Sequence, residues 1–282
     1  MSCSIPLSGY EGEQALHWFD PTPGVIPWPA RELLEKYAGI PEEDIEKEVI
    51  SLRNMAWKTF TYPCIGQFEF LELQLSTRTR LYHRVLSRLY SGQYLIDMGC
   101  CLGQDLRKLA FDGVLPSHLV GVDLHPEFIE LGYDLFRDRD RQPGIKMLVG
   151  DIQAPVDAEP WPLLKHGFDI VNFSMILHAF EHDEQAVMLE KAVHVLRDEP
   201  GAMMMGTACG SRDGRVSCWS GKDIPLHNAE TFTRLVAEVG ERTGTRWQVE
   251  AEVDNGFSMH DGKRKWVGPH LKRLVFEITR LE

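Results

Sequence analysis

The sequence lacks three features, each of which would indicate a different class of protein. Its six cysteines include no Cys-x-x-Cys pair, so neither a zinc site nor a disulfide framework is indicated. No apolar run is long enough to cross a bilayer, the longest lying around residues 170–180. Residues 1–14 have neither the basic residues nor the apolar core of a signal peptide. These absences predict a reduced, cytoplasmic protein without membrane insertion.

Basic residues are also in deficit. The 30 lysines and arginines stand against 42 acidic residues, which gives a formal net charge of −12. A nucleic-acid backbone or an anionic membrane would be repelled at long range, so we expect no nucleic-acid partner. Solubility alone also explains the charge. The hydrophobic fraction of 43% is ordinary for a globular protein with a sizeable core.

A strand, a glycine turn and a helix are predicted in succession over residues 94–111. An apolar run ends at Asp97, and Gly99 and Gly103 bracket a turn that precedes a helical pattern over residues 104–111. This order is typical of the first unit of a nucleotide-binding α/β sheet, in which glycines let a ligand approach the backbone. The Gly-x-x-x-Gly spacing is not that of dinucleotide enzymes, and no Gly-Lys-Ser/Thr of a phosphate loop follows.

The next strand, residues 119–123, ends in an acidic residue. Asp123 lies 20 residues past Gly103, about where an acidic side chain meets ribose hydroxyls in nucleotide-binding folds. Pro126 follows closely, so a helix N-cap is the alternative explanation. We favour the ribose role because the glycine loop stands at the right distance.

The whole succession resembles the class I S-adenosylmethionine-dependent methyltransferases. Their pattern is a glycine loop after Asp97, an acid at Asp123, a Gly-Asp-Ile turn at residues 150–152 and an aromatic-bearing fourth strand at residues 168–173. From about residue 31 to residue 246 the chain is also similar to fungal natural-product methyltransferases of meroterpenoid pathways. Three long motifs carry that similarity: residues 62–68 (YPCIGQF), 99–104 (GCCLGQ) and 128–141 (FIELGYDLFRDRDR).

The resemblance implies S-adenosylmethionine as the cofactor. Asp97 would help to hold the amino group of its methionine moiety, and Asp151 with Ile152 would form the adenine site. A turn after a strand explains Asp151 nearly as well. The expected cofactor-binding residues are Asp97, Gly99, Gly103, Asp123, Leu124, Asp151, Ile152 and Asn172.

We therefore expect an α/β fold: a Rossmann-like methyltransferase sheet, mostly parallel with one antiparallel edge strand, and an N-terminal helical extension. Residues 1–90 would form this extension and cover the substrate, while residues 91–282 would form the core, with a cap inserted at 207–225. Residues 247–253 and 271–280 alternate in polarity and predict paired edge strands. One helix of the extension shows a single buried face with apolar residues at 3–4 spacing: Ile45, Val49, Leu52 and Ala56.

Residues 178–182, His-Ala-Phe-Glu-His, match a zinc-protease pattern whose two histidines share a helix face. Because this short match directly follows a buried strand of a consistent α/β series, we assign no metal.

His178 falls just past the fourth strand, where open α/β sheets bind ligands, and could orient an acceptor oxygen or take its proton. A solvated or helix-capping histidine explains this position equally well.

The related enzymes commonly esterify a carboxylate on a terpenoid–polyketide skeleton, so the resemblance implies a small natural-product acceptor of that kind. A carboxylate needs no strong base, whereas a phenol, with a pKa of about 10, would benefit from one.

Tyr62 and Phe68 belong to an aromatic stretch that either lines the acceptor pocket or packs the extension onto the sheet. An acidic protein needs a local cation or hydrogen-bond donors for an acidic acceptor. We expect this cation to be one of Arg212, Arg215 or Lys222 in the cap. Lys263, Arg264 and Lys265, in the loop before the last strand, are the less favoured candidates.

Other functions stay open at this point. They are transfer to a phenol oxygen or to carbon, recruitment of the fold to cyclisation or isomerisation, and small-molecule binding without catalysis. A homodimer is compatible with the sequence.

Overall fold

The computed structural model describes residues 18–77, 79–142, 144–219, 222–254 and 270–282. Seven strands of this part form one sheet in the order β3-β2-β1-β4-β5-β9-β8. β9 pairs antiparallel with both β5 and β8, and the other pairs are parallel. The strands are β1 (Leu95–Met98), β2 (Leu119–Asp123), β3 (Lys146–Val149), β4 (Ile170–Ser174), β5 (Met203–Gly210), β8 (Trp247–Asp254) and β9 (Lys272–Arg280).

This topology confirms the predicted fold, a mostly parallel methyltransferase-type sheet with one antiparallel strand beside its edge. β1, β2 and β5 are buried along their whole length because helices cover both faces of the sheet, which explains their continuous apolar runs. β8 alternates between half-buried and exposed residues, as an edge strand with one covered face does.

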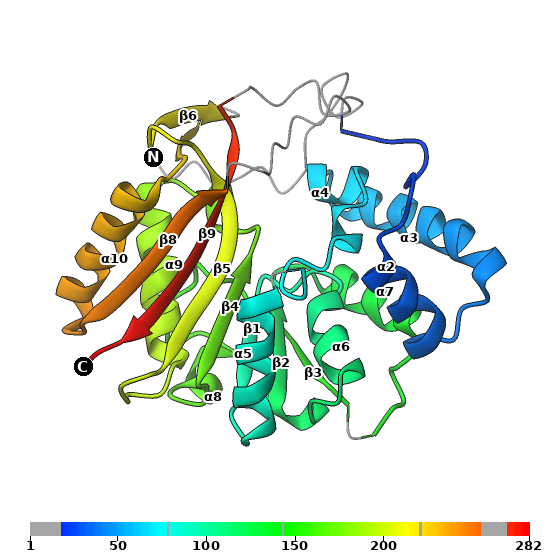
Figure 1. Cartoon of the computed structure of the whole chain (residues 1–282), viewed down its shortest axis with the longest axis horizontal. Coiled ribbons are helices and arrows are strands. Elements are labelled where there is room, and N and C mark those ends of the chain that lie inside the picture. The colour runs from blue at the N-terminus through cyan, green and yellow to red at the C-terminus, as the bar shows by residue number, and fades with distance from the viewer. Residues whose placement is uncertain (1–17, 78, 143, 220–221, 255–269) are drawn as a thin grey trace.

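Helices flank the sheet on both faces (Figure 1). α5 (Thr79–Tyr90) and α6 (Gln104–Phe111) share a core with one face. α8 (Trp161–Leu164), α9 (His182–Val195) and α10 (Ala229–Thr243) pack against the other face. Within the described residues, no helix is both long enough and apolar enough to cross a membrane.

The N-terminal extension is helical and packs on α7 (Pro126–Phe136). The predicted apolar face of α3 is confirmed, since all four of its positions are buried. That face meets α7 in one hydrophobic core, which attaches the extension beside β2 and β3 (Figure 1). The elements are α2 (Trp28–Glu32), the π-helical η1 (Leu33–Tyr37), η2 (Glu42–Asp44), α3 (Ile45–Thr59), α4 (Pro63–Gly66) and η3 (Glu69–Leu71).

A buried ion pair joins the extension to the sheet domain. Arg107 of α6 donates to Asp138 from Nε at 2.8 Å and from Nη2 at 2.9 Å, and the hydroxyl of Tyr37 donates to the same carboxylate at 2.8 Å. Arg107 also donates to the carbonyl of Leu102 in the glycine loop. One buried carboxylate therefore links the extension, α6 and the chain after α7.

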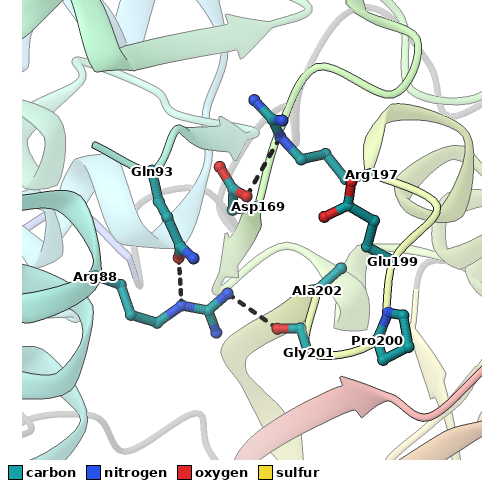
Figure 2. Close-up of a pocket in the computed structure, with 8 residues that line it drawn as sticks. All are labelled: Arg88, Gln93, Asp169, Arg197, Glu199, Pro200, Gly201 and Ala202. Carbon is teal, nitrogen blue, oxygen red and sulfur yellow. Dashed lines mark hydrogen bonds and ion pairs between the residues drawn. The ribbon is translucent and has the colours of Figure 1, made fainter. Parts of the chain in front are cut away.

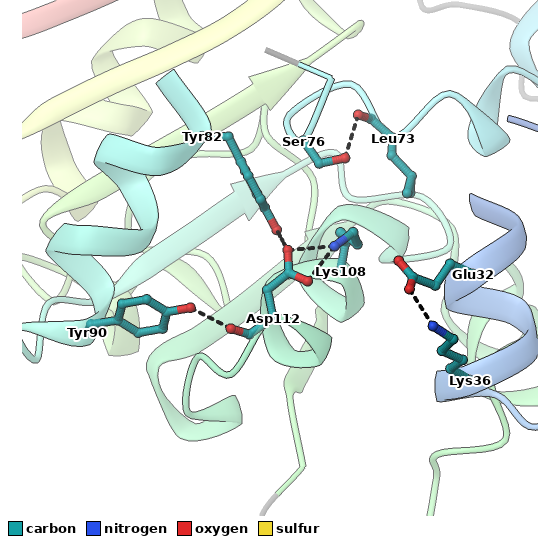
Figure 3. Close-up of polar contacts among 8 residues, drawn as sticks. All are labelled: Glu32, Lys36, Leu73, Ser76, Tyr82, Tyr90, Lys108 and Asp112. Atoms are coloured by element: carbon teal, nitrogen blue, oxygen red, sulfur yellow. Dashed lines mark hydrogen bonds and ion pairs between the residues drawn. The ribbon is translucent and has the colours of Figure 1, made fainter. Parts of the chain in front are cut away.

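A second carboxylate connects α5 to the end of α6 (Figure 3). Asp112 accepts hydrogen bonds from the hydroxyl of Tyr82 and the ammonium of Lys108, both at 2.6 Å, and its carbonyl accepts from Tyr90. Burial raises the pKa of Tyr82, so its hydroxyl stays a donor. The Glu32–Lys36 pair in the same figure spans one turn of the extension at 2.7 Å.

One predicted boundary is wrong. Residues 207–210 were expected in the cap, but they continue β5, where Thr207 pairs with Ser174 of β4 and Gly210 pairs with Lys272 of β9. Small buried side chains allow both neighbouring strands to approach there. The rest of the expected cap is a two-stranded hairpin of β6 (Val216–Trp219) and β7 (Lys222–Pro225).

Candidate functional site

The turn after β1 depends on its two glycines. Gly99 has φ +81° and Gly103 has φ +65°, which are left-handed values that favour glycine. A Cβ on Gly99 would collide with Ile176, and one on Gly103 would collide with Met147. This turn therefore requires glycine at both positions, for its backbone conformation and for close packing, and it lies at the carboxyl end of the sheet, where ligands of α/β folds bind.

Asp123 bridges the loops that follow β1 and β2. The backbone N–H of Cys101 donates to its Oδ2 at 2.7 Å, and the N–H of His125 donates to its Oδ1 at 2.9 Å. His125, and not Asp123, occupies the N-cap of α7, so helix capping does not explain the acid. Burial raises the pKa of Asp123. Leu124 beside it is 45% exposed, an apolar side chain that a bound ring could cover.

Asp97 and Asn172 face each other across β1 and β4. The Nδ2 of Asn172 donates to Oδ1 of Asp97 at 2.7 Å, and the hydroxyl of Ser174 donates to Oδ1 of Asn172 at 3.1 Å. Burial raises the pKa of Asp97 to about 8, and the charge of Asp105 and then that of Asp123 add to the rise. Acidic groups that raise one another's pKa in a buried site suit a cationic ligand.

Asp151 and Ile152 follow β3. The exposed carboxylate of Asp151 accepts from the N–H of Gln153 at 2.8 Å, which forms a local turn, while Ile152 belongs to the core. The N–H of Gly150 donates to the carbonyl of Asp123 at 2.9 Å, so this turn lies beside the loop after β2. The structure thus brings the expected cofactor residues to one end of β1–β4. Their role as ligands stays a prediction.

His178 lies on η5 (Leu177–Ala179), directly after β4. The backbone N–H of Cys209 on β5 donates to its Nδ1 at 3.2 Å, and burial lowers the pKa of the ring to about 4. A backbone N–H only donates, so the neutral ring carries its proton on Nε2. His178 therefore presents a hydrogen-bond donor and not a free base.

The zinc-protease pattern does not form one helical face. Phe180 and Glu181 are extended between η5 and α9, and α9 begins only at His182. His182 pairs with Glu238 of α10 at 3.0 Å, whereas His178 binds β5. Among the residues that the structure describes, no three His, Cys, Asp or Glu side chains form a group that could hold a metal ion.

The two aromatic candidates lie in different surroundings. Tyr62 is half-buried, and its ring centre lies 6.0 Å from that of His125, beside the loop after β2. Phe68 is only 3% exposed and lies under the guanidinium of Arg53, 4.3 Å from the ring centre. This burial favours packing for Phe68, while Tyr62 lies close to the ligand end of the sheet.

Two of the expected cap cations already face carboxylates. Lys222 is buried, and its Nζ lies 3.3 Å from Glu184, the residue that also completes the N-terminal capping box of α9. Arg215 is exposed and pairs with Asp213 at 3.0 Å. Arg212 is exposed as well. Lys263, Arg264 and Lys265 lie outside the described residues.

A small hollow of about 120 Å³ lies at the opposite end of the sheet (Figure 2). Gln93, Asp169 and Ala202 of its lining precede β1, β4 and β5, so it opens at the amino ends of these strands. Its guanidinium groups are held within the lining, with Arg88 bound to Gln93 and Arg197 paired with Asp169 at 3.3 Å. This place is not where open α/β sheets bind ligands.

Sequence reasoning missed three polar residues near the site. Ser174 extends the Asp97–Asn172 contact, and His125 supplies an N–H to Asp123. Gln67 lies within the motif 62–68, but only the structure shows that it is buried. The signal in each case was a polar residue adjacent to a predicted site residue or within a resemblance motif.

Comparison with known families divides the chain into two matched regions. Residues 18–71 match the model described as the meroterpenoid methyltransferase N-terminal domain, and residues 95–199 match the methyltransferase domain. The chain is similar to O-methyltransferase atr3 of Stereocaulon alpinum, with 34% identity over 279 residues, 96% of this chain and 78% of that protein. It is also similar to methyltransferase trt5 of Aspergillus terreus, with 35% identity over 79% of this chain and 80% of that protein.

Two solved structures share the fold at low sequence identity. Phospholethanolamine N-methyltransferase 2 of Haemonchus contortus aligns with a TM-score of 0.53 at 15% identity, over 81% of this chain and 60% of that one. The cyclase SpnF aligns with a TM-score of 0.51 at 15% identity, over 71% of this chain and 82% of that one. At such identity the likeness concerns the fold alone.

Proposed function

Because this chain belongs to the family of S-adenosylmethionine-dependent methyltransferases, we propose that it transfers the donor's methyl group to a carboxylate oxygen of a terpenoid or polyketide-type natural product. The observation that carries the choice of acceptor is the hydrogen bond from Cys209 to Nδ1 of His178. It leaves an N–H donor, and no basic nitrogen, at the end of β4.

The donor fits the residues after β1, β2 and β4. S-adenosylmethionine, when bound, supplies an electrophilic methyl group on a sulfonium. Asp123 keeps acceptor capacity on both oxygens for the two ribose hydroxyls, and Asp97 offers a carboxylate to the cationic amino group. The left-handed backbone of Gly99 and Gly103 gives this turn the conformation that precedes the α6 N-terminus beside the donor residues.

Methyl transfer from a sulfonium releases a neutral leaving group, so the protein chiefly has to align the acceptor and exclude water. A carboxylate is already ionised near pH 7 and needs no base. With its Nε2 protonated, His178 can hold one acceptor oxygen in place by donation. A phenol would instead need its proton removed, and His178 has neither the free nitrogen nor the pKa for that task.

The test uses hydroxyaryl acids that carry both a carboxyl and a phenolic hydroxyl group, with and without a prenyl chain. The protein is incubated with S-adenosylmethionine labelled in its methyl group, and the product is treated with mild alkali. We expect the label in an ester that alkali cleaves. A label that survives alkali would indicate a phenol ether or a carbon-methylated product and would refute the carboxylate proposal. Conversion of an acid without label would instead support the cyclisation alternative.

A further inference from the structure

Gln67 directly follows α4 and has an unusual side chain. The residue is only 9% exposed, yet within the described structure neither its Nε2 nor its Oε1 has a hydrogen-bond partner. Native proteins rarely leave a buried amide unpaired, because its lost hydrogen bonds to water are then not replaced. An amide in this state keeps its full capacity to bind a group from outside the fold.

The surroundings of α4 place this amide near the ligand end of the sheet. Tyr62, the N-cap of α4, contacts the ring of His125, which follows Asp123. Ile65 and Cys64 of α4 pack in the same hydrophobic cluster as Cys101 and Leu102 of the loop after β1. Figure 1 shows α4 at the same end of the molecule as the β6 strand of the hairpin.

Two other buried polar side chains, Gln185 and Arg53, are paired within the fold. Gln185, which is fully buried on α9, donates from Nε2 to the carbonyl of Phe180 at 3.0 Å, and its Oε1 lies 2.8 Å from Nε2 of His227. Arg53 of the extension donates to the carbonyl of Gly66 at 2.9 Å. Within the described residues several other side chains keep one buried unpaired atom, among them Gln74, Gln104 and Thr207, but only Gln67 has both polar atoms of its side chain unpaired.

We propose that Gln67 is a positioning residue whose amide binds the acceptor's carboxylate. Its Nε2 donates to the carboxylate oxygen that does not react, and its Oε1 accepts from a hydroxyl group of the same acceptor. This assignment rests on the proposed function.

A neutral amide suits this task better than the cap cations do. Lys222 and Arg215 already face Glu184 and Asp213, so their charges are compensated. A cation would also stabilise the negative charge of the nucleophile before attack, which slows the reaction, whereas an amide orients the carboxylate with less stabilisation of its ground state. The donor's amino group and ribose hydroxyls, in turn, are matched by Asp97 and Asp123 and do not require Gln67.

The first experiment needs no acceptor. Thermal unfolding is measured for the wild type, for Gln67→Leu and for the matched control Gln185→Leu. We expect Gln67→Leu to unfold at or above the wild-type temperature, because it removes an unpaired buried amide. Gln185→Leu should unfold several degrees lower, because it leaves the partners of a paired amide unsatisfied. A fall in Gln67→Leu as large as that in the control would show a structural role and overturn the proposal.

The second experiment separates the two substrates. In calorimetry, Gln67→Leu should bind S-adenosylhomocysteine with the same affinity as the wild type. Its KM for the hydroxyaryl acid in the ester assay should rise about tenfold or more. Gln67→Glu should raise this KM further, because its carboxylate repels the acid. If affinity for S-adenosylhomocysteine falls by the same factor as that for the acid, Gln67 belongs to the donor site and the proposal fails.

Failure of the proposed function would be visible separately, as a wild-type protein that esterifies no acid. Binding of the same hydroxyaryl acids to protein loaded with S-adenosylhomocysteine then decides the role of Gln67. Weaker binding in Gln67→Leu than in the wild type supports the carboxylate contact. Equal binding in both, or binding in neither, overturns it.

Discussion

The loops after β1 and β2 and the β6–β7 hairpin lie at the same end of the sheet, but they hold charge in opposite ways. At the loops, the carboxylates of Asp97 and Asp123 accept hydrogen bonds only from neutral N–H groups, and burial raises their pKa values although these hydrogen bonds oppose the rise. In the hairpin and directly before it, Lys222 and Arg215 already lie against carboxylates. The loops are thus prepared for a cationic ligand, whereas these hairpin charges are already compensated. A charged side chain near a site is therefore evidence for ligand binding only when no oppositely charged group of the protein lies against it.

The largest expected effect contrasts a buried ion pair behind the loops with an exposed pair on the hairpin. Asp138→Ala should lower the free energy of unfolding by about 3–5 kcal/mol, because Arg107 would stay buried without its partner. Asp213→Ala, at the exposed partner of Arg215, should leave the unfolding midpoint unchanged. Urea unfolding followed by circular dichroism measures both. Similar shifts in the two variants would contradict the contrast.

The next effect concerns donor affinity. Asp123→Ala should weaken binding of S-adenosylhomocysteine by about 1–3 kcal/mol, because charge-assisted hydrogen bonds to the ribose are lost. Isothermal titration calorimetry measures it, with Asp213→Ala as the control that keeps wild-type affinity. An unchanged affinity in Asp123→Ala would remove this carboxylate from the donor site.

The third effect is a proton release. With a pKa of about 8, Asp97 is mostly protonated at pH 7 in the free protein. A bound ammonium group favours the carboxylate, so donor binding at pH 7 should release up to one proton, and the release should fade as the pH rises above 8. Calorimetry in two buffers with different ionisation enthalpies measures the release, which Asp97→Asn should abolish. Binding heats that do not depend on the buffer would show that Asp97 is already ionised.

The smallest effect is expected on the hairpin. Arg215→Ala and Lys222→Met should change the acceptor KM by no more than about twofold, because each side chain neutralises an acid of the protein itself. A tenfold rise of the acceptor KM in either variant would support the prediction that a cation of the cap steers the acceptor's carboxylate. It would contradict the view that the charges of the hairpin are already compensated. Arg212→Ala completes the series, and an increase confined to this variant would assign the steering role to Arg212.

Much of the fold was predictable because its signals are local. Continuous apolar runs mark the buried parallel strands, and the apolar face from Ile45 to Ala56 marks α3, so these elements follow from short stretches of sequence. The end of β5 was not predictable, because residues 207–210 are strand only through pairing with β4 and β9. The break between His178 and His182 was hidden for the same reason, since Cys209 on another strand holds the histidine ring.

Local sequence is enough to predict the sheet, the glycine turn and the acids near the ends of β1 and β2, because their spacing along the chain sets their place at the strand ends. The partners of the charged and polar groups, in contrast, depend on how the chain folds in three dimensions. The tertiary structure paired Lys222 with Glu184, placed the proton of His178 on Nε2 and left the Gln67 amide buried without a partner among the described residues. Pairing joins residues that lie far apart in the chain, and a group's pKa and readiness to bind depend on burial and on these neighbours, which no local pattern records.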